Sequence, residues 1–262
     1  MSPPIKQKLL HLLEQGDLNG FNPWRLIKSF KALPAFIKDL NRYSRLNSRS
    51  TFRVTFRNLW PMLHDRQAGA GTVGGHYFHQ DLWAAKKIFE RRPAQHLDIG
   101  SRIDGFIAHL LVFMPVTIVD IRTIAGTVRA LEFIQDDATE LTSLEDDSVD
   151  SLSSLHAAEH FGLGRYADPV DPDSCFRFMN NLQRVLSPGG RLYFSVPIGR
   201  ERVEFNAHRV FDIRTVLKSL SGLSLVSFAF VGDDGCLYEN VDPVKTPNSN
   251  YACGLFEFTK PS

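Results

Sequence analysis

Short apolar runs alternate with amphipathic segments along most of the chain beyond residue 75. The apolar runs suit buried strands, and they fall at residues 96–99, 116–119, 151–155, 191–196, 225–231 and 251–258. Apolar residues at helical spacing occupy most of the intervals, at residues 82–89, 103–113, 124–131, 172–186 and 212–220. This alternation predicts an α/β fold built on a doubly wound, largely parallel sheet.

The segment Gln95–Arg122 reads as strand, tight turn, helix and strand, and it carries the most informative chemistry. The dinucleotide fingerprint G-x-G-x-x-G is not met, because Asp98 stands at the position of its first glycine. A carboxylate at that place repels a pyrophosphate and attracts an ammonium group. Asp120, at the end of the second strand, is spaced to accept hydrogen bonds from ribose hydroxyls. A nucleoside that bears an amino acid, such as S-adenosylmethionine, satisfies both acids.

Four separated segments resemble, in order, the motifs of the class I S-adenosylmethionine-dependent methyltransferases. They are residues 98–105 (DIGSRIDG), Asp120, residues 136–138 (DDA) and residues 156–161 (HAAEHF). The resemblance implies a Rossmann-like seven-stranded sheet in the order 3-2-1-4-5-7-6, with the last strand antiparallel, and S-adenosyl-L-methionine as cofactor. It also implies the cofactor-binding residues, namely Asp98, Gly100, Ser101, Gly105, Asp120, Asp137, Ala138 and His156.

Polar side chains gather where the fourth strand ends, in residues 156–168. Within the resemblance, this strand opens toward the methyl group, and His160, His208 and Glu159 are the candidate catalytic residues. A histidine is suited to act as a base near neutral pH, which favours a hydroxyl acceptor on a small molecule or saccharide. The alternative is that Glu159 and His160 only cap or pack the local structure. No metal ligand is expected here, because the spacing fits no standard ligand motif.

Three further segments, residues 76–85 (HYFHQDLWAA), 159–169 (EHFGLGRYADP) and 205–211 (FNAHRVF), resemble a narrower and largely uncharacterised methyltransferase-like family. Its members are often linked with surface-polysaccharide synthesis. His76, Tyr77, His79 and Gln80 precede the first strand and are candidate lid groups over the cofactor.

Charge divides the chain into two parts. Residues 1–60 hold eleven of the 30 Lys and Arg and three of the 29 Asp and Glu, which gives +8 there and −7 in the remainder. We expect a basic helical extension with a glycine-rich joint over residues 1–75 and a methyltransferase-like α/β domain over residues 76–262. The basic residues either form a solvated face of this extension or contact an anionic membrane surface or a protein, and no recognisable nucleic-acid module is present.

The three cysteines are far apart and form no C-x-x-C motif, so neither a disulfide framework nor a zinc site is indicated. No apolar run is long enough to span a bilayer, and a cytoplasmic location, with peripheral membrane association, is expected.

The sequence therefore predicts an S-adenosylmethionine-dependent methyltransferase. The alternative is a non-catalytic binding or scaffold protein that keeps the fold, which Arg102 favours because it replaces a glycine of the cofactor turn. A nicotinamide oxidoreductase is a weaker alternative.

Overall fold

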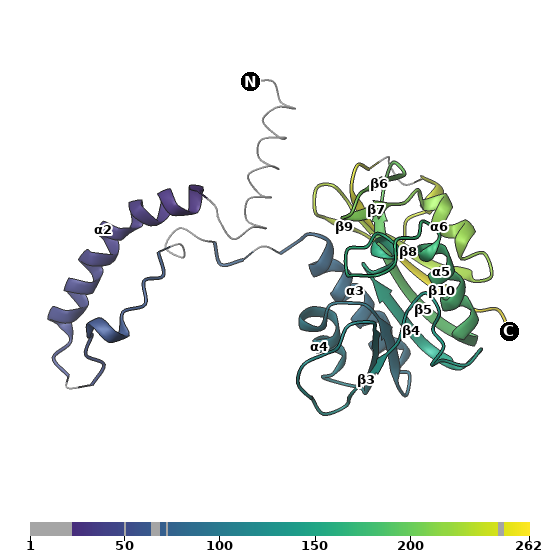
Figure 1. The fold of residues 1–262 in the computed structure, drawn as a ribbon, viewed down its shortest axis with the longest axis horizontal. Helices are drawn as coiled ribbons and strands as arrows, with labels where there is room; N and C mark the ends of the chain where they lie inside the picture. Colours follow the sequence, from purple (N-terminus) through teal and green to yellow (C-terminus); the bar gives the residue numbers. More distant parts are fainter. Residues whose placement is uncertain (1–22, 50, 64–68, 72, 246–248) are drawn as a thin grey trace, which may run out of the picture. The chain divides into compact units, whose positions relative to one another are not determined.

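The computed structural model describes residues 23–49, 51–63, 69–71, 73–245 and 249–262. Contacts divide the chain into two units, Met1–Thr72 and Val73–Ser262, which are described separately. The expected boundary at residue 75 stays a prediction. Figure 1 shows the elements of each unit.

The first unit contains helix α2 (Pro23–Leu46), followed by the 3-10 turn η2 (Phe56–Asn58). Proline usually interrupts a helix, and the sequence pattern therefore favours a break at Pro34, but α2 continues through it. None of the side chains described in residues 31–63 is buried. The leucines at residues 9–13, whose clustering favours a further helix, lie outside the described residues. Among the described helices of the whole chain, none is both long and apolar enough to cross a membrane.

The second unit is built on one sheet in the order β3-β2-β1-β4-β5-β10-β8-β9. The strands are β1 (His96–Ile99), β2 (Val116–Asp120), β3 (Leu131–Gln135), β4 (Val149–Leu155), β5 (Leu186–Ile198), β8 (Ser224–Val231), β9 (Leu237–Tyr238) and β10 (Ala252–Thr259). Strands β1 to β5 are parallel to one another. Strand β10 runs antiparallel to both β5 and β8. The predicted order 3-2-1-4-5-7-6 is thus confirmed, with the short β9 added at the edge.

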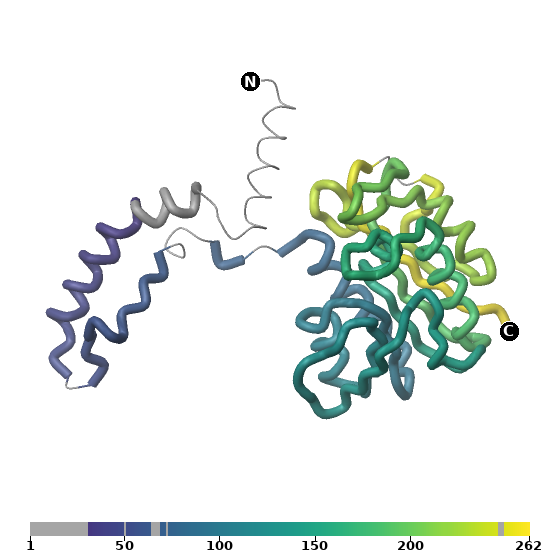
Figure 2. The backbone as a smooth tube through the Cα atoms, in the orientation of Figure 1, coloured from purple at the N-terminus to yellow at the C-terminus, as the bar shows by residue number. Residues whose placement is uncertain are grey.

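Helices cover both faces of the sheet, and their course can be followed in Figure 2. On one face, α5 (Ser174–Val185) and α6 (Ile213–Ser219) pack on the larger core cluster. On the other face, the smaller core cluster is covered by α3 (His76–Arg91), the π-helical turn η4 (Ile103–Ile107) and α4 (Ala108–Leu110). The remaining described elements are short: η5 (Ala158–His160), β6 (Arg202–Glu204), β7 (His208–Val210) and η6 (Pro243–Lys245).

The helix predicted over residues 124–131 is not formed, because β-branched residues and Gly126, whose φ is +89°, disfavour it. An aspartate is a common N-cap residue, which makes Asp81 and Asp212 candidates. Asp81 instead lies inside α3 and is buried. The Asp212 side chain caps α6, where its Oδ1 accepts from the backbone N–H of Arg214 at 2.9 Å.

Candidate functional site

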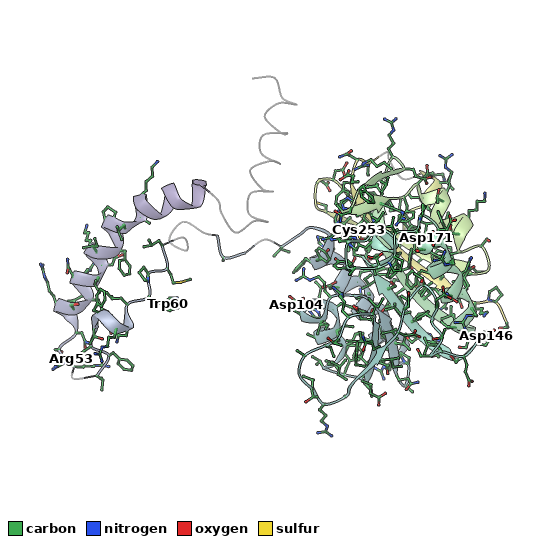
Figure 3. The ribbon with its side chains drawn as sticks, in the orientation of Figure 1. Arg53, Trp60, Asp104, Asp146, Asp171 and Cys253 are labelled. Carbon is green, nitrogen blue, oxygen red and sulfur yellow. The ribbon has the colours of Figure 1, made fainter. Side chains whose placement is uncertain are left out.

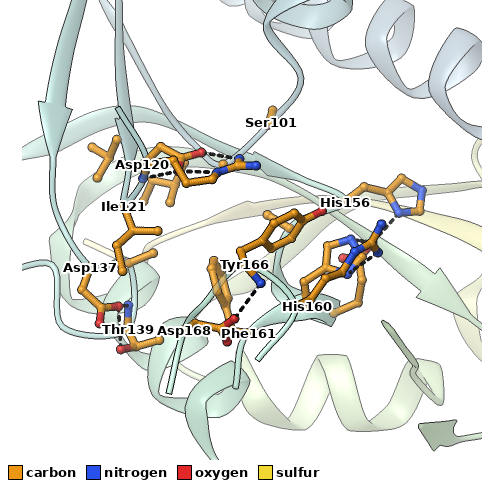
Figure 4. Close-up of a pocket in the computed structure, with 18 of the residues that line it drawn as sticks. Ser101, Asp120, Ile121, Asp137, Thr139, His156, His160, Phe161, Tyr166 and Asp168 are labelled. Carbon is orange, nitrogen blue, oxygen red and sulfur yellow. Dashed lines mark hydrogen bonds and ion pairs between the residues drawn. The ribbon is translucent and has the colours of Figure 1, made fainter. Parts of the chain in front are cut away.

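A cavity of about 960 Å³ opens at the carboxyl ends of the parallel strands. Nine of the eleven predicted cofactor-binding and catalytic residues line it: Gly100, Ser101, Asp120, Asp137, Ala138, His156, Glu159, His160 and His208. Arg102 and the candidate lid residue Tyr77 line it as well. Figure 4 shows Asp120 and Asp137 at one end of the cavity and His156 and His160 at the other. Asp98 and Gly105 do not line it.

Asp98 lies beneath the cavity wall and is fully buried. The register of β1 and β4 sets it beside Ser153, whose hydroxyl donates to Asp98 Oδ1 at 2.5 Å. Ser101 donates to the same oxygen through its hydroxyl at 2.6 Å and to Oδ2 through its backbone N–H at 3.0 Å. Burial raises the pKa of Asp98 to about 6, although these hydrogen bonds act in the opposite direction. Direct contact between Asp98 and a ligand therefore stays a prediction.

A buried polar seam continues from Asp98 into the sheet. His96 lies between two serine hydroxyls, with Nδ1 at 2.8 Å from Ser151 and Nε2 at 2.8 Å from Ser153. Burial lowers the pKa of His96 to about 3, so its imidazole is neutral. The seam fixes the strand ends beneath the cavity, since each of its groups is paired.

Gly100 and Gly105 have different structural roles. Gly100 adopts a φ of +73°, and an added Cβ would lie 3.0 Å from the Cβ of Ala157. That turn allows the backbone after β1 to face the cavity. At Gly105 an added Cβ would collide with a carboxylate oxygen of Asp81, so this glycine admits the side chain from α3.

The two predicted cofactor-binding acids that line the cavity already accept hydrogen bonds from protein groups. Asp120 Oδ1 accepts from the backbone N–H of Arg122 at 2.8 Å and from its Nε at 3.0 Å, and Oδ2 accepts from Nη2 at 2.7 Å. The Arg122 guanidinium also lies 4.7 Å from the ring centre of Tyr166. Asp137 Oδ1 accepts from the backbone N–H and the hydroxyl of Thr139, both at 2.8 Å.

Arg102 lines the cavity, and its guanidinium is paired with an acid of the same turn. Its Nη2 donates to the exposed Asp104 at 2.9 Å, and it lies 4.8 Å from the ring centre of Tyr77. With half of its side chain exposed, Arg102 is not enclosed by the pocket.

The histidine end of the cavity centres on Glu159, which is 1% exposed. Glu159 Oε1 lies 2.6 Å from Nδ1 of His156 and 3.8 Å from Nε2 of His160. Burial works against charge on both partners of the first pair. The charge of His156 nevertheless lowers the pKa of Glu159. The neighbouring Cys253 and Glu159 raise the pKa of His156 well above its usual value. We interpret the pair as a buried ion pair.

His160 is oriented by the loop before β7. Its Nδ1 lies 2.7 Å from the carbonyl oxygen of Ala207, which can only accept, so Nδ1 carries the proton. Nε2 is then the basic nitrogen. Burial lowers the pKa of His160, with Glu159 acting in the opposite direction, and burial likewise lowers that of His208.

Three buried polar atoms at this end have no hydrogen-bond partner within the described part of the chain: His156 Nε2, Glu159 Oε2 and His208 Nε2. His208 Nε2 does lie 3.4 Å from Glu204 Oε2, within ion-pair distance but without hydrogen-bond geometry. Buried polar atoms are nearly always paired, so this concentration indicates a place for a polar ligand.

Sequence reasoning missed one grouping. Ligating atoms of His76, His156 and Cys253 lie within 4.8 Å of one another, although the three residues are far apart in the sequence. The expectation of no metal ligand rested on spacing along the chain, which carries no signal for such a cluster.

The comparisons with known proteins agree with the fold. A family model described as "Caenorhabditis protein of unknown function, DUF268" matches residues 122–234. No curated protein matches the sequence.

Solved structures match over most of the second unit. One is the N-methyltransferase NodS from Bradyrhizobium japonicum WM9 in complex with S-adenosyl-L-homocysteine, with 16% identity, 71% of this chain and 88% of that chain covered, and a TM-score of 0.50. Another is the YcgJ protein from Bacillus subtilis, with 17% identity, 70% and 99% coverage and a TM-score of 0.50. A third is the cyclase SpnF, with 14% identity, 69% and 81% coverage and a TM-score of 0.50. At these identities the likeness shows the fold alone, which is the Rossmann-like fold of class I methyltransferases.

Proposed function

We propose that this protein is an S-adenosylmethionine-dependent methyltransferase that acts on a hydroxyl group of a small molecule or saccharide. The observation that carries the proposal is the division of the cavity. Carboxylates on neighbouring strand ends lie at one end, and a histidine-glutamate cluster with three unpaired buried atoms lies at the other. The complex of NodS with S-adenosylhomocysteine supports the choice of cofactor.

At the cofactor end, Asp120 accepts hydrogen bonds from the ribose hydroxyls, and Asp137 with Ala138 contacts the adenine. The backbone of Gly100 and the side chain of Ser101 hold the methionine part. Asp98 does not line the cavity, so it contributes by holding the hydroxyl of Ser101, which does line it. Each charge-assisted bond to a dry carboxylate contributes about 1.5–3 kcal/mol.

At the acceptor end, His160 is the base. Its protonated Nδ1 is held by Ala207, which leaves Nε2 to take the proton of a hydroxyl, and Glu159 at 3.8 Å stabilises the imidazolium that forms. The sulfonium supplies the driving force for transfer, so the remaining task of the site is to align acceptor and methyl group. His208 is the second candidate for the base.

Calorimetry with S-adenosylmethionine and S-adenosylhomocysteine tests the cofactor assignment. We expect one molecule of either ligand per chain, with weaker binding in Asp120→Asn and unchanged binding in Asp212→Asn, which alters a similar exposed aspartate outside the cavity. Transfer of labelled methyl groups to a panel of sugars and phenols then tests the acceptor class. Absence of binding at high micromolar ligand refutes the proposal.

A non-catalytic scaffold is the second candidate, and the pairing of Asp120 with Arg122 favours it. In a scaffold this pair is permanent, whereas in an enzyme the ribose must displace it. The same calorimetry separates the two, and binding of NAD(P) in its place would support the nicotinamide alternative.

The N-terminal extension, residues 1–75, docks the protein on an anionic membrane surface. In its described residues, large apolar side chains are exposed beside basic ones, with Phe56 91% and Trp60 83% exposed. Figure 3 labels Trp60 and Arg53 in this unit. Binding to phosphatidylserine vesicles, but not to phosphatidylcholine alone, is expected. The Lys38→Glu, Arg42→Glu double variant should bind at least about tenfold more weakly, while Lys86→Glu in the second unit should not. A protein contact at a cytoplasmic location is the alternative outcome.

A further inference from the structure

Three side chains with metal-ligating atoms meet beside the acceptor end of the cavity. They come from the first residue of α3, from the segment after β4 and from the start of β10: His76, His156 and Cys253. Their ligating atoms all lie within 4.8 Å of one another. Cys253 is fully buried, His156 is 8% exposed and His76 is half-buried. Figure 3 labels Cys253 within the second unit.

His156 is held as a metal-binding histidine is held. Glu159 Oε1 lies 2.6 Å from its Nδ1, so Nε2 is the nitrogen available to a metal once binding displaces the Nε2 proton of the ion pair. That Nε2 is buried and has no hydrogen-bond partner among the residues that the structure describes. A carboxylate on the far nitrogen fixes the ring and raises its basicity, which is the usual outer contact of a metal-bound imidazole.

Cys253 is a free cysteine in a polar pocket of the core. Its Sγ lies 3.8 Å from the side-chain oxygen of Gln80, and that oxygen accepts from the hydroxyl of Ser195 at 2.6 Å. A buried cysteine beside two imidazoles is a borderline-soft donor set, which suits zinc better than it suits magnesium or calcium.

We propose that His76, His156 and Cys253 bind one Zn²⁺ ion. Zinc–ligand bonds of about 2.0–2.3 Å place tetrahedral ligand atoms about 3.4–3.6 Å apart, so the cluster must contract by about 1 Å. The His76 and His156 rings are nearly parallel, at 9°, with centroids 5.4 Å apart. One ring must therefore turn. His76 is the less buried of the two, and its turn must also break its stacking on Tyr251, whose ring centroid lies 5.2 Å away.

The ion has two consequences for the molecule. It links α3 to the ends of β4 and β10. It also leaves a fourth coordination position, which a water or an acceptor oxygen takes, because His156 and the neighbouring Tyr251 both line the cavity. This inference does not rest on methyl transfer, since metal binding is measured without any cofactor or acceptor.

The test uses the full-length protein, stripped with a chelator and titrated with ZnCl₂ against a chromophoric competitor. One tightly bound zinc per chain is expected. The variants Cys253→Ser and His76→Ala should each weaken zinc binding at least about 100-fold, because even loss of an outer contact costs about 10–100-fold. Glu159→Gln, which removes that outer contact, should cost about 10–100-fold. Cys236→Ser, which removes an exposed free thiol, should change nothing.

Replacement of zinc by Co²⁺ in the unmodified protein tests cysteine ligation without any substitution, so a misfolded variant cannot explain the result. A thiolate-to-cobalt charge-transfer band is expected, and its absence contradicts ligation by Cys253. The proposal is overturned if zinc does not bind stoichiometrically, if binding is the same in folded Cys253→Ser and His76→Ala proteins, or if copper binds in its place.

Discussion

Replacement of Arg122 by methionine should tighten the binding of S-adenosylmethionine. Asp120 receives three donors from this one residue, at 2.7–3.0 Å, so both carboxylate oxygens already have a partner. A ribose that binds Asp120 must displace the two side-chain bonds of Arg122. The free energy of that ion pair is therefore subtracted from the binding free energy of the cofactor.

The size of this cost follows from exposure. The side chain of Arg122 is 54% exposed and that of Asp120 is 17% exposed, so the pair is closer to a surface ion pair than to a buried one. Such pairs contribute about 0–1 kcal/mol, and 1 kcal/mol corresponds to about a fivefold change in Kd. Arg122→Met keeps most of the aliphatic stem and should lower the Kd by about two- to fivefold, less at high salt.

Calorimetry at low and high salt measures the effect, and the chain offers a matched control. Arg214 makes the same three bonds to Asp212, at 2.9, 3.0 and 2.8 Å, away from the cavity. Arg214→Met should leave the Kd unchanged. Weaker binding in Arg122→Met would mean that Arg122 holds the ligand, and an equal change in both variants would mean a general charge effect. Either result refutes the reasoning.

Three other predictions concern single side chains. His160→Ala should lower turnover at least tenfold and leave the Kd of the cofactor unchanged. Replacement of the exposed His109 by alanine should change neither turnover nor Kd. Full turnover in His160→Ala would clear His160 of the role of base. Burial raises the pKa of Asp98 to about 6, above the ~3.9 of an unfolded chain. The folded state therefore binds this proton more tightly than the unfolded state does. The stability that results is present below about pH 4 and is lost as the pH rises through 6. In urea denaturation, the unfolding free energy of the wild type should therefore exceed that of Asp98→Asn by more at pH 4 than at pH 7, with a change of at most about 3 kcal/mol. The same difference at both pH values would count against the shifted pKa. Gly105→Ala should cost about 1–3 kcal/mol of unfolding free energy by overpacking a buried carboxylate of α3, whereas Gly69→Ala, with open space around it, should cost little; equal melting temperatures would contradict the collision.

The parts of the fold that could be predicted from the sequence are those set by local patterns. Apolar runs between amphipathic segments located the central strands, and the acid at the end of one run located the cavity wall at Asp120. The resemblance to methyltransferases added Asp137, which lines the same cavity. The helix predicted over residues 124–131 failed because its apolar spacing competes with β-branched residues and Gly126. In α5, Phe178 is fully buried and Phe176 is 38% exposed, although Phe176 is the one that lies three residues before Met179 and fits the helical spacing of the apolar positions.

Other features depend on partners that no local pattern names. Asp98 looked available to a ligand, but the parallel register of β1 and β4 sets Ser153 beside it, and the carboxylate turns inward. The hydrogen bond between His160 and Ala207 likewise joins two loops that are remote in the chain, so no local pattern favours one nitrogen of His160 over the other.

The cluster of His76, His156 and Cys253 could be predicted from the sequence only in part. Once the order 3-2-1-4-5-7-6 is accepted, the antiparallel β10 must begin at the edge where the parallel strands end, and its register pairs Cys253 with Pro197 near the end of β5. Cys253 therefore belongs to the same edge as His156, and topology alone was enough to bring these two together. His76 was not accessible in this way, because the start of α3 is held by a hydrogen bond from Gly75 to the carbonyl of Gly235 across the chain. A search for ligands by strand ends, rather than by spacing along the sequence, would have found two of the three.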